Sequence, residues 1–196
     1  MRIEIVSGSP RHNSATNRVA LHLKKVLEER TEHEIGLIDV REHVLPHIQG
    51  VITSADKAPV IHRELAKRMF AADAFVIVTP EYNGSYSPAM QNLFDHFGKQ
   101  PHKTFGIVTA SPGALGGIRA AMQLQQFVMA LLGIASPYML ITPQVEQKFD
   151  ENGDLIDASF QASVDSFIKE FLWLAERVNN VAIRQFDNSA MAKLAS

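Results

Sequence analysis

Apolar segments with the length of β-strands alternate five times with segments of helical spacing, and this alternation restricts the chain to few folds. The strand-like segments are rich in Val, Ile and Phe, whereas Val19, Leu23 and Leu27 share one face of a helix. Such alternation predicts a single doubly wound α/β domain, with a parallel sheet between layers of helices. The predicted strands are residues 3–7, 34–40, 74–79, 104–110 and 138–142, and the predicted helices are residues 15–29, 58–72, 88–98, 117–132 and 159–178.

The composition excludes several classes of function. The 196 residues are 46% hydrophobic and 20% charged, as is ordinary for one globular domain. The formal net charge is −2 and no basic run exceeds two residues, which argues against binding to nucleic acid. Because the chain has no cysteine, disulfides, thiolate catalysis and cysteine-bound metals are excluded, and redox chemistry would require a bound cofactor.

The chain enters a strand pattern at once, without a secretory signal, and no apolar run approaches the roughly 20 residues of a transmembrane helix. We therefore expect a cytoplasmic protein that does not bind a membrane. The eight histidines show no metal-ligand spacing, so we expect no metal site. We expect residues 1–178 to form the domain and residues 179–196 to form a C-terminal tail.

Ligands of doubly wound sheets bind beyond the carboxyl ends of the strands. The first loop, residues 8–17, combines hydroxyl and amide side chains, Arg11 and the free N–H groups of a helix N-terminus, as a phosphate requires. It has neither the Gly-Lys-Ser/Thr ending of a Walker A loop nor the three glycines of a dinucleotide loop. The alternative is that Ser14 or Thr16 only caps the helix.

The second loop, residues 79–88, follows the most apolar strand and contains Tyr82, Gly84 and Tyr86. A tyrosine ring can cover an aromatic ligand, while backbone N–H and C=O groups bind the polar edge of that ligand. The alternative is a plain strand–helix connection with proline at the helix start.

The third loop, residues 111–117, contains three glycines within five residues. Glycine allows the backbone to pass close to a planar ligand and to donate N–H groups to it. The alternative is a tight turn followed by a helix.

Residues 80–85, with the sequence Pro-Glu-Tyr-Asn-Gly-Ser, resemble the characteristic segment of the NAD(P)H-dependent FMN reductase family, as do Asn92 and Asp95 beyond them. Where members of that family usually have Pro-Gly, this chain has Ser87-Pro88.

Two further segments resemble the same family, in the same order along residues 3–142. Residues 111–119 resemble its Ser-x-Gly-x-x-Gly-Gly-x-Arg segment. Its Gly-Ser-x-Arg-x-x-Ser phosphate loop is matched by Gly8, Ser9, Arg11 and Ser14.

The resemblance implies a flavodoxin-like, three-layer α/β/α fold with a five-stranded parallel sheet in the order 2-1-3-4-5. It implies an oxidoreductase with FMN as cofactor and NADPH or NADH as co-substrate, which passes electrons to a quinone, an azo compound, a metal oxyanion or free flavin. It also implies a homodimer or homotetramer, with helices 88–98 and 117–132 packed across the dimer. The alternatives are an FMN-binding electron carrier or redox-sensing module without nicotinamide turnover, and a phosphate-binding domain without flavin.

The resemblance also assigns the cofactor-binding residues. Those expected at the FMN phosphate are Ser9, Arg11, Ser14 and Thr16, with Asn17 as the alternative to Thr16. Those expected beside the ring are Pro80, Glu81, Tyr82, Asn83 and Ser85, and those expected at its far edge are Ser111, Gly113, Gly116 and Gly117. Because this chemistry needs orientation rather than an acid or a base, no side chain is predicted to be catalytic.

Overall fold

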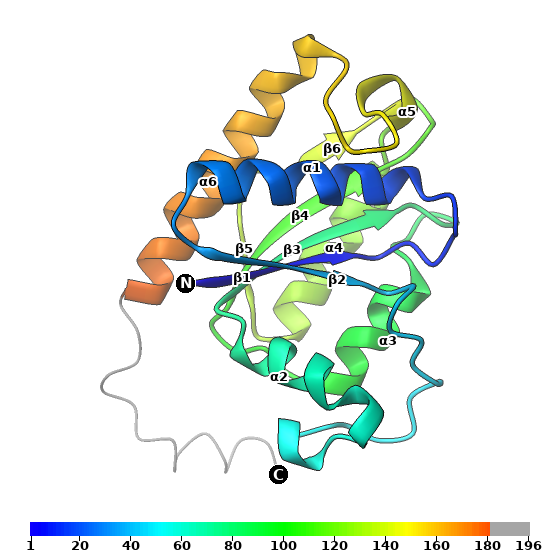
Figure 1. Ribbon diagram of the computed structural model, residues 1–196. Helices are drawn as coiled ribbons and strands as arrows, with labels where there is room; N and C mark the ends of the chain where they lie inside the picture. The colour runs from blue at the N-terminus through cyan, green and yellow to red at the C-terminus, as the bar shows by residue number, and fades with distance from the viewer. Residues whose placement is uncertain (181–196) are drawn as a thin grey trace.

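Parallel strands form one sheet in the order β2-β1-β3-β4-β5. A further strand, β6, pairs with the C-terminal part of β4, whereas β5 pairs with the N-terminal part of β4. The computed structural model describes residues 1–180 (Figure 1). The strands are β1 (Arg2–Ser7), β2 (Glu34–Asp39), β3 (Ala74–Pro80), β4 (Thr104–Ala110), β5 (Ile134–Ala135) and β6 (Leu140–Thr142). The predicted strand order is therefore confirmed.

The carboxyl ends of the strands meet at one edge of the sheet. Strand β3 is buried along its whole length, as expected for a central parallel strand covered on both faces. Pro80 at its end is in register with Ala110 of β4, and Ala110 is in register with Thr142 of β6. In Figure 1 the arrowheads of β1 and β3 point toward this same edge, so the loops that follow these strands lie together.

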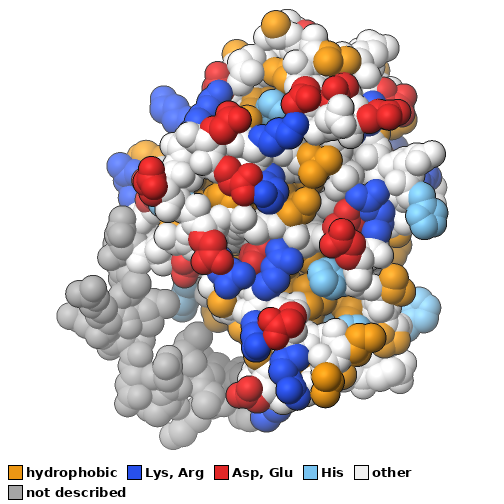
Figure 2. Space-filling view, viewed as in Figure 1, with side chains coloured by type: hydrophobic (Ala, Val, Ile, Leu, Met, Phe, Trp, Pro, Cys, Tyr) orange, Lys and Arg blue, Asp and Glu red, His pale blue; other side chains and the backbone are white. Residues whose placement is uncertain are grey.

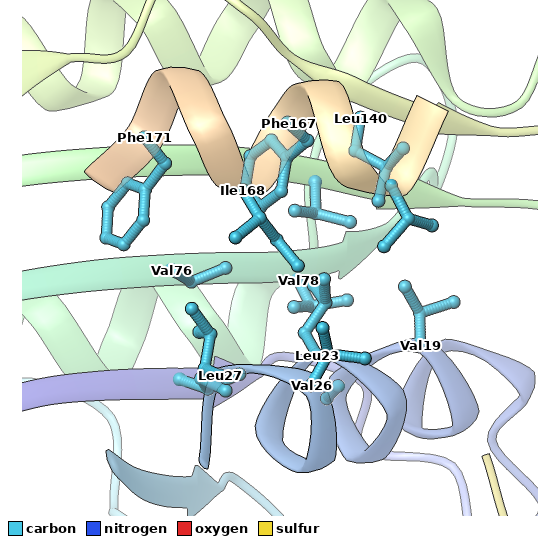
Figure 3. Packing of buried hydrophobic residues seen from close by; sticks show 14 of the residues in the cluster. Val19, Leu23, Val26, Leu27, Val76, Val78, Leu140, Phe167, Ile168 and Phe171 are labelled. Carbon is cyan, nitrogen blue, oxygen red and sulfur yellow. The ribbon is translucent and has the colours of Figure 1, made fainter. Parts of the chain in front are cut away.

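Two helical layers cover the sheet. The helices are α1 (Ala15–Arg30), α2 (Arg63–Ala71), α3 (Pro88–Phe97), α4 (Ile118–Ala130), α5 (Val145–Lys148) and α6 (Gln161–Asn180). Helices α1 and α6 pack in one hydrophobic cluster, and α2, α3 and α4 pack in a second cluster on the opposite face. Figure 3 shows the first cluster, in which Leu23 of α1 and Ile168 of α6 point toward Val78 of β3.

Ion pairs join the outer elements. Arg30 of α1 and Asp165 of α6 lie 2.7 Å apart, and Lys25 of α1 lies 2.7 Å from Asp154 in the turn before α6. On the face seen in Figure 2, basic and acidic side chains are interspersed rather than gathered by sign.

Two expected elements differ from the structure, and in both cases proline is the cause. The expected helix 58–72 is two 3₁₀ turns, η1 (Ala55–Lys57) and η2 (Val60–His62), followed by α2. Ala58 precedes Pro59 and adopts an extended conformation, because the proline ring disfavours the helical region for the residue before it. Of the expected strand 138–142, only residues 140–142 form a strand, which is β6. The two residues of β5 were not expected, and Pro137, which has no N–H for the ladder, separates β5 from β6.

The C-terminal helix begins and ends later than expected for residues 159–178. The 3₁₀ turn η3 (Ala158–Phe160) precedes α6, and α6 includes Asn179 and Asn180. The rest of the predicted tail, residues 181–196, lies outside the described residues. Within residues 1–180, every helix is too short or too polar to cross a bilayer.

Candidate functional site

A cleft of about 230 Å³ opens at the carboxyl edge of the sheet. It is lined by parts of all three predicted loops and by α5. Eight of the predicted residues line it together: Ser9, Arg11, Ser14, Thr16, Pro80, Glu81, Tyr82 and Ser111. The fold therefore brings side chains that are up to about a hundred positions apart in the chain to one site.

The first loop presents hydrogen-bond donors at the N-terminus of α1. The Ser14 side chain caps the helix by accepting a hydrogen bond from the Asn17 N–H at 3.2 Å. The first turn of α1 contains no acidic residue, so the helix itself supplies no carboxylate that would offset the positive end of its dipole. Ser9 is 2% exposed and its Oγ accepts from the Arg11 N–H at 3.4 Å. This donor set suits a phosphate.

Thr16, rather than Asn17, faces the cleft. Thr16 is buried and lines it. The Asn17 side chain turns toward β1, where its Oδ1 accepts a hydrogen bond from the Ser7 hydroxyl at 2.9 Å. Of the two residues expected for this position, Thr16 therefore lines the cleft and Asn17 does not.

Arg41 holds the first loop from the side of β2, a feature that the sequence analysis missed. Its Nη1 donates to the His12 carbonyl at 2.9 Å, and its Nε donates to both carboxylate oxygens of Asp39 at 2.9 and 3.0 Å. The hydrogen bonds that Arg41 donates to Asp39 raise the pKa of Arg41 above its ordinary value. The only sequence signal for this contact is an aspartate at the end of a strand next to the first loop.

The second loop turns tightly after Tyr82. The Tyr82 N–H donates to the Ser85 carbonyl at 2.8 Å, and the Ser85 N–H donates back at 3.1 Å. Asn83 and Gly84 between them have φ values of 53° and 85°, as a type I′ turn requires. Asn83 and Ser85 form the turn and do not line the cleft.

Tyr82 is the tyrosine of this loop that faces the cleft. The Arg11 guanidinium carbon lies 4.8 Å from the centre of its ring, a cation–π geometry, and its hydroxyl lies 3.5 Å from Ser9 Oγ. Tyr86 instead packs on Phe127 of α4 with ring centres 5.1 Å apart. Burial, with a smaller contribution from Asp95, raises the pKa of the Tyr86 hydroxyl.

The third loop requires glycine where it passes β6. Gly116 and Gly117 have φ values of 61° and 88°. A Cβ on Gly116 would lie 2.6 Å from Ile141 Cγ2 and 2.8 Å from the Pro143 nitrogen. Gly113, Gly116 and Gly117 lie outside the cleft lining and shape the turn behind Ser111.

Glu81 and Arg119 connect the second loop to the start of α4. Arg119 Nε donates to Glu81 Oε1 at 2.7 Å, and the Arg119 backbone N–H donates to Oε2 at 3.2 Å. Arg119 Nη2 also pairs with Oε1. The Glu81 side chain is 10% exposed, whereas that of Arg119 is 67% exposed.

Helix α5 contributes cleft residues that the sequence analysis did not identify. Val145 is buried in the cleft wall and Glu146 is exposed at its rim. A helix of four residues is too short to produce a periodic hydrophobic pattern, so no signal was available. The remaining lining residues are Asn13, Ala15, Ala110 and Pro112.

The donor set fits FMN, a phosphate ester joined to a planar ring. The N-terminus of α1 and the hydroxyls of the first loop line the cleft, and the Arg11 guanidinium lies 4.8 Å from the centre of the Tyr82 ring. The buried ends of β3 and β4, Pro80 and Ala110, complete the wall.

Comparisons with known proteins agree with this fit. The model of the NADPH-dependent FMN reductase family matches residues 1–144. An FMN-dependent NADPH-azoreductase of Staphylococcus aureus is 28% identical over 174 residues, which cover 86% of this chain and 92% of the relative.

Solved structures show the same fold. The FerB flavoenzyme NAD(P)H:(acceptor) oxidoreductase of Paracoccus denitrificans matches with a TM-score of 0.71 and 21% identity, over 90% of this chain and 97% of that one. A flavodoxin of Pseudomonas aeruginosa matches with a TM-score of 0.54 and 18% identity, over 87% and 99% of the two chains. The predicted flavodoxin-like fold is confirmed.

Proposed function

The chain belongs to the NADPH-dependent FMN reductase family, and we propose that it passes electrons from a reduced nicotinamide, through bound FMN, to a small acceptor. Membership makes it an oxidoreductase with FMN as cofactor and NADPH as co-substrate, where the resemblance implied FMN with NADPH or NADH. The proposed acceptors are a quinone, an azo compound, a metal oxyanion or free flavin. The azo compound has the most direct support, because the Staphylococcus aureus relative is an azoreductase.

The observation that carries the proposal is the single cleft shared by the first and second loops. In it, we assign the FMN phosphate to Ser9, Arg11, Ser14 and Thr16 at the N-terminus of α1. We assign the ring to the strand ends beside Tyr82 and Ser111. The turn formed by Asn83, Gly84 and Ser85 fixes the position of Tyr82, and the glycines of the third loop fix that of Ser111.

Bound FMN supplies the hydride and electron chemistry. The protein residues bind and orient. The buried Ser9 and Thr16 fix the phosphate end, while Tyr82 covers apolar surface and reduces the access of water to the ring. None of these roles requires a side chain that gains or loses a proton, so we nominate no catalytic acid or base.

The test is a panel of cofactors and acceptors on the purified protein. We expect a yellow protein after incubation with FMN, and oxidation of NADPH or NADH when menadione, an azo dye, chromate or free FMN is added. A protein that remains colourless with excess FMN would overturn the proposal. Flavin binding without nicotinamide oxidation would instead indicate an FMN-binding electron carrier or redox-sensing module.

We also propose that the protein is a cytoplasmic homodimer or homotetramer. Met122 and Met129, seven positions apart on α4, are 53% and 71% exposed. They line a shallow groove of about 470 Å³ together with Gly84 and Arg119. Exposed methionines on one helix face favour contact with another subunit, which would then lie next to the second loop.

A further inference from the structure

The ion pair of Glu81 and Arg119 places two opposite charges at the edge of the candidate flavin cleft. Glu81 lines the cleft and its side chain is 10% exposed. The Arg119 guanidinium lies on the outer side of this carboxylate, with Nε 2.7 Å from Oε1. The Glu81 carboxylate therefore lies at the cleft wall, and the compensating Arg119 guanidinium lies directly behind it.

Each partner is unfavourable without the other. A carboxylate in a largely buried position is costly unless it is paired. Arg119 lies in the first turn of α4, where a cation opposes the helix dipole, and it is the only charged residue of that helix. The backbone N–H of Arg119 also donates to Glu81 at 3.2 Å, so the carboxylate caps the helix and neutralises the cation at once.

The other two charged groups that line the cleft, Arg11 and Glu146, do not place a shielded charge beside the ring position. Arg11 lies over the Tyr82 ring in the first loop, which we assign to the phosphate. Glu146 is exposed at the rim, where water screens its charge. Glu81 is thus the shielded charge beside the ring position, and Arg119 is its partner.

We propose that this pair sets the electrostatic potential at the flavin ring and so tunes its reduction potential, with Arg119 as a positioning residue that acts through Glu81. The inference rests on the proposed function. Reduction of a flavin by two electrons and one proton places one negative charge on its ring. An unpaired carboxylate beside the ring opposes that charge, an unpaired guanidinium favours it, and the intact pair is nearly neutral.

The test compares Arg119→Gln, Glu81→Gln and the double variant, each as full-length protein reconstituted with FMN. FMN affinity is measured by fluorescence titration, and the reduction potential is measured by equilibration with reference dyes. In Arg119→Gln we expect reduced FMN to lose about tenfold in affinity relative to oxidised FMN, which lowers the potential by about 30 mV for a two-electron couple. In Glu81→Gln we expect a rise of similar size, and in the double variant a value close to that of the unmodified protein.

The opposite signs separate charge from scaffolding. If the pair only held the two loops together, both single variants would weaken FMN in both oxidation states and leave the potential unchanged or shifted in one direction. Shifts in the same direction, or less than a threefold change in relative affinity in both single variants, would overturn the inference.

Two controls complete the design. Lys169→Gln removes the same charge from an exposed position on α6 and should leave the potential unchanged. Arg119→Lys retains the charge and should retain the potential, so if Glu81→Gln does not fold, the contrast between Lys and Gln at position 119 decides. If the unmodified protein binds no FMN, the proposed function fails; if it binds FMN and oxidises NADPH while position 119 has no effect on the potential, only this inference fails.

Discussion

Glu4 lies fully buried in β1, where its carboxylate accepts hydrogen bonds from Arg68 Nε at 3.0 Å and Arg2 Nε at 3.2 Å. This arrangement occupies the space above Gly36 of β2. A Cβ at position 36 would lie 2.1 Å from Glu4 Oε2. The side chain of one strand thus dictates a glycine in the neighbouring strand, because a buried ion pair has little freedom to move aside.

We predict that Gly36→Ala lowers the free energy of unfolding by about 2–3 kcal/mol, as overpacking of a filled interior does. Urea denaturation measures this change. The matched control is Gly50→Ala, since an added Cβ there would meet nothing within 4 Å, and we expect a change within about 0.5 kcal/mol. Equal effects of the two substitutions would contradict the account of the Glu4 site.

Arg11 provides a second test at this scale, because it is the guanidinium of the proposed phosphate site. We predict that Arg11→Met weakens FMN binding by about tenfold or more, the value of roughly one charge-assisted hydrogen bond. Riboflavin, which has the same ring without the phosphate, should lose much less. If FMN and riboflavin lost equal affinity, Arg11 would instead contact the flavin ring, next to Tyr82, over which its guanidinium lies.

Single residues differ in how far the sequence reveals their role. The loops that contain Ser9 and Tyr82 were predicted because each follows a strand whose end the fold rule places at the ligand edge, and the family resemblance then identified the two residues. The contact of Arg41 with the first loop was not predicted, since it depends on the pairing of β2 with β1, which no local pattern encodes. Asn83 was expected beside the ring, and the structure instead places it in a type I′ turn, a role that the Asn-Gly pair itself indicates.

At the scale of elements, the sequence predicts long periodic segments well and short ones poorly. The bounds of β4 agree with the expected 104–110, because an apolar run flanked by polar residues has clear ends. The four residues of α5 gave no pattern, although they complete the cleft wall. The 3₁₀ turns around Pro59 depend on the chemistry of one ring rather than on periodicity.

Lys103 connects two elements and gives a pH-dependent prediction. Its Nζ donates to the Met69 and Phe70 carbonyls at 3.1 and 3.2 Å, so it caps the C-terminus of α2 from the start of β4. Burial lowers the pKa of Lys103 to about 8. Between about pH 8 and 10.4 the unfolded chain therefore binds the proton that the folded chain has lost, and the free energy of unfolding rises with pH in this window.

We predict that the stability difference between the unmodified protein and Lys103→Met shifts in favour of the unmodified protein between pH 8 and 10, by up to about 1 kcal/mol per pH unit. Urea denaturation of both proteins at several pH values measures this difference. Other groups titrate alike in the two proteins, so their contributions to the free energy of unfolding cancel. A difference that stays constant across this window would show that Lys103 titrates alike in the folded and unfolded chains.

At the scale of the whole molecule, the exposed methionines of α4 are the surface that we propose for self-association. We predict that the unmodified protein is a dimer or larger in light-scattering chromatography, and that Met122→Glu with Met129→Glu shifts it toward the monomer, because charge burial opposes the contact. Ile156→Glu is the control, since Ile156 is 58% exposed and lies outside α4. A monomeric unmodified protein, or a double variant that remains fully associated, would rule out this surface.

The fold places the first loop, the second loop and the start of the third at one edge of the sheet, and the proposed function requires FMN in the cleft that they form. The most direct measurement is an anaerobic titration of the FMN-reconstituted protein with NADPH, followed by the visible absorbance of the flavin. We predict that stoichiometric NADPH bleaches the bound flavin and that an added quinone restores its colour. A protein that retains no FMN, or bound flavin that NADPH does not bleach while dithionite does, would contradict the central claim.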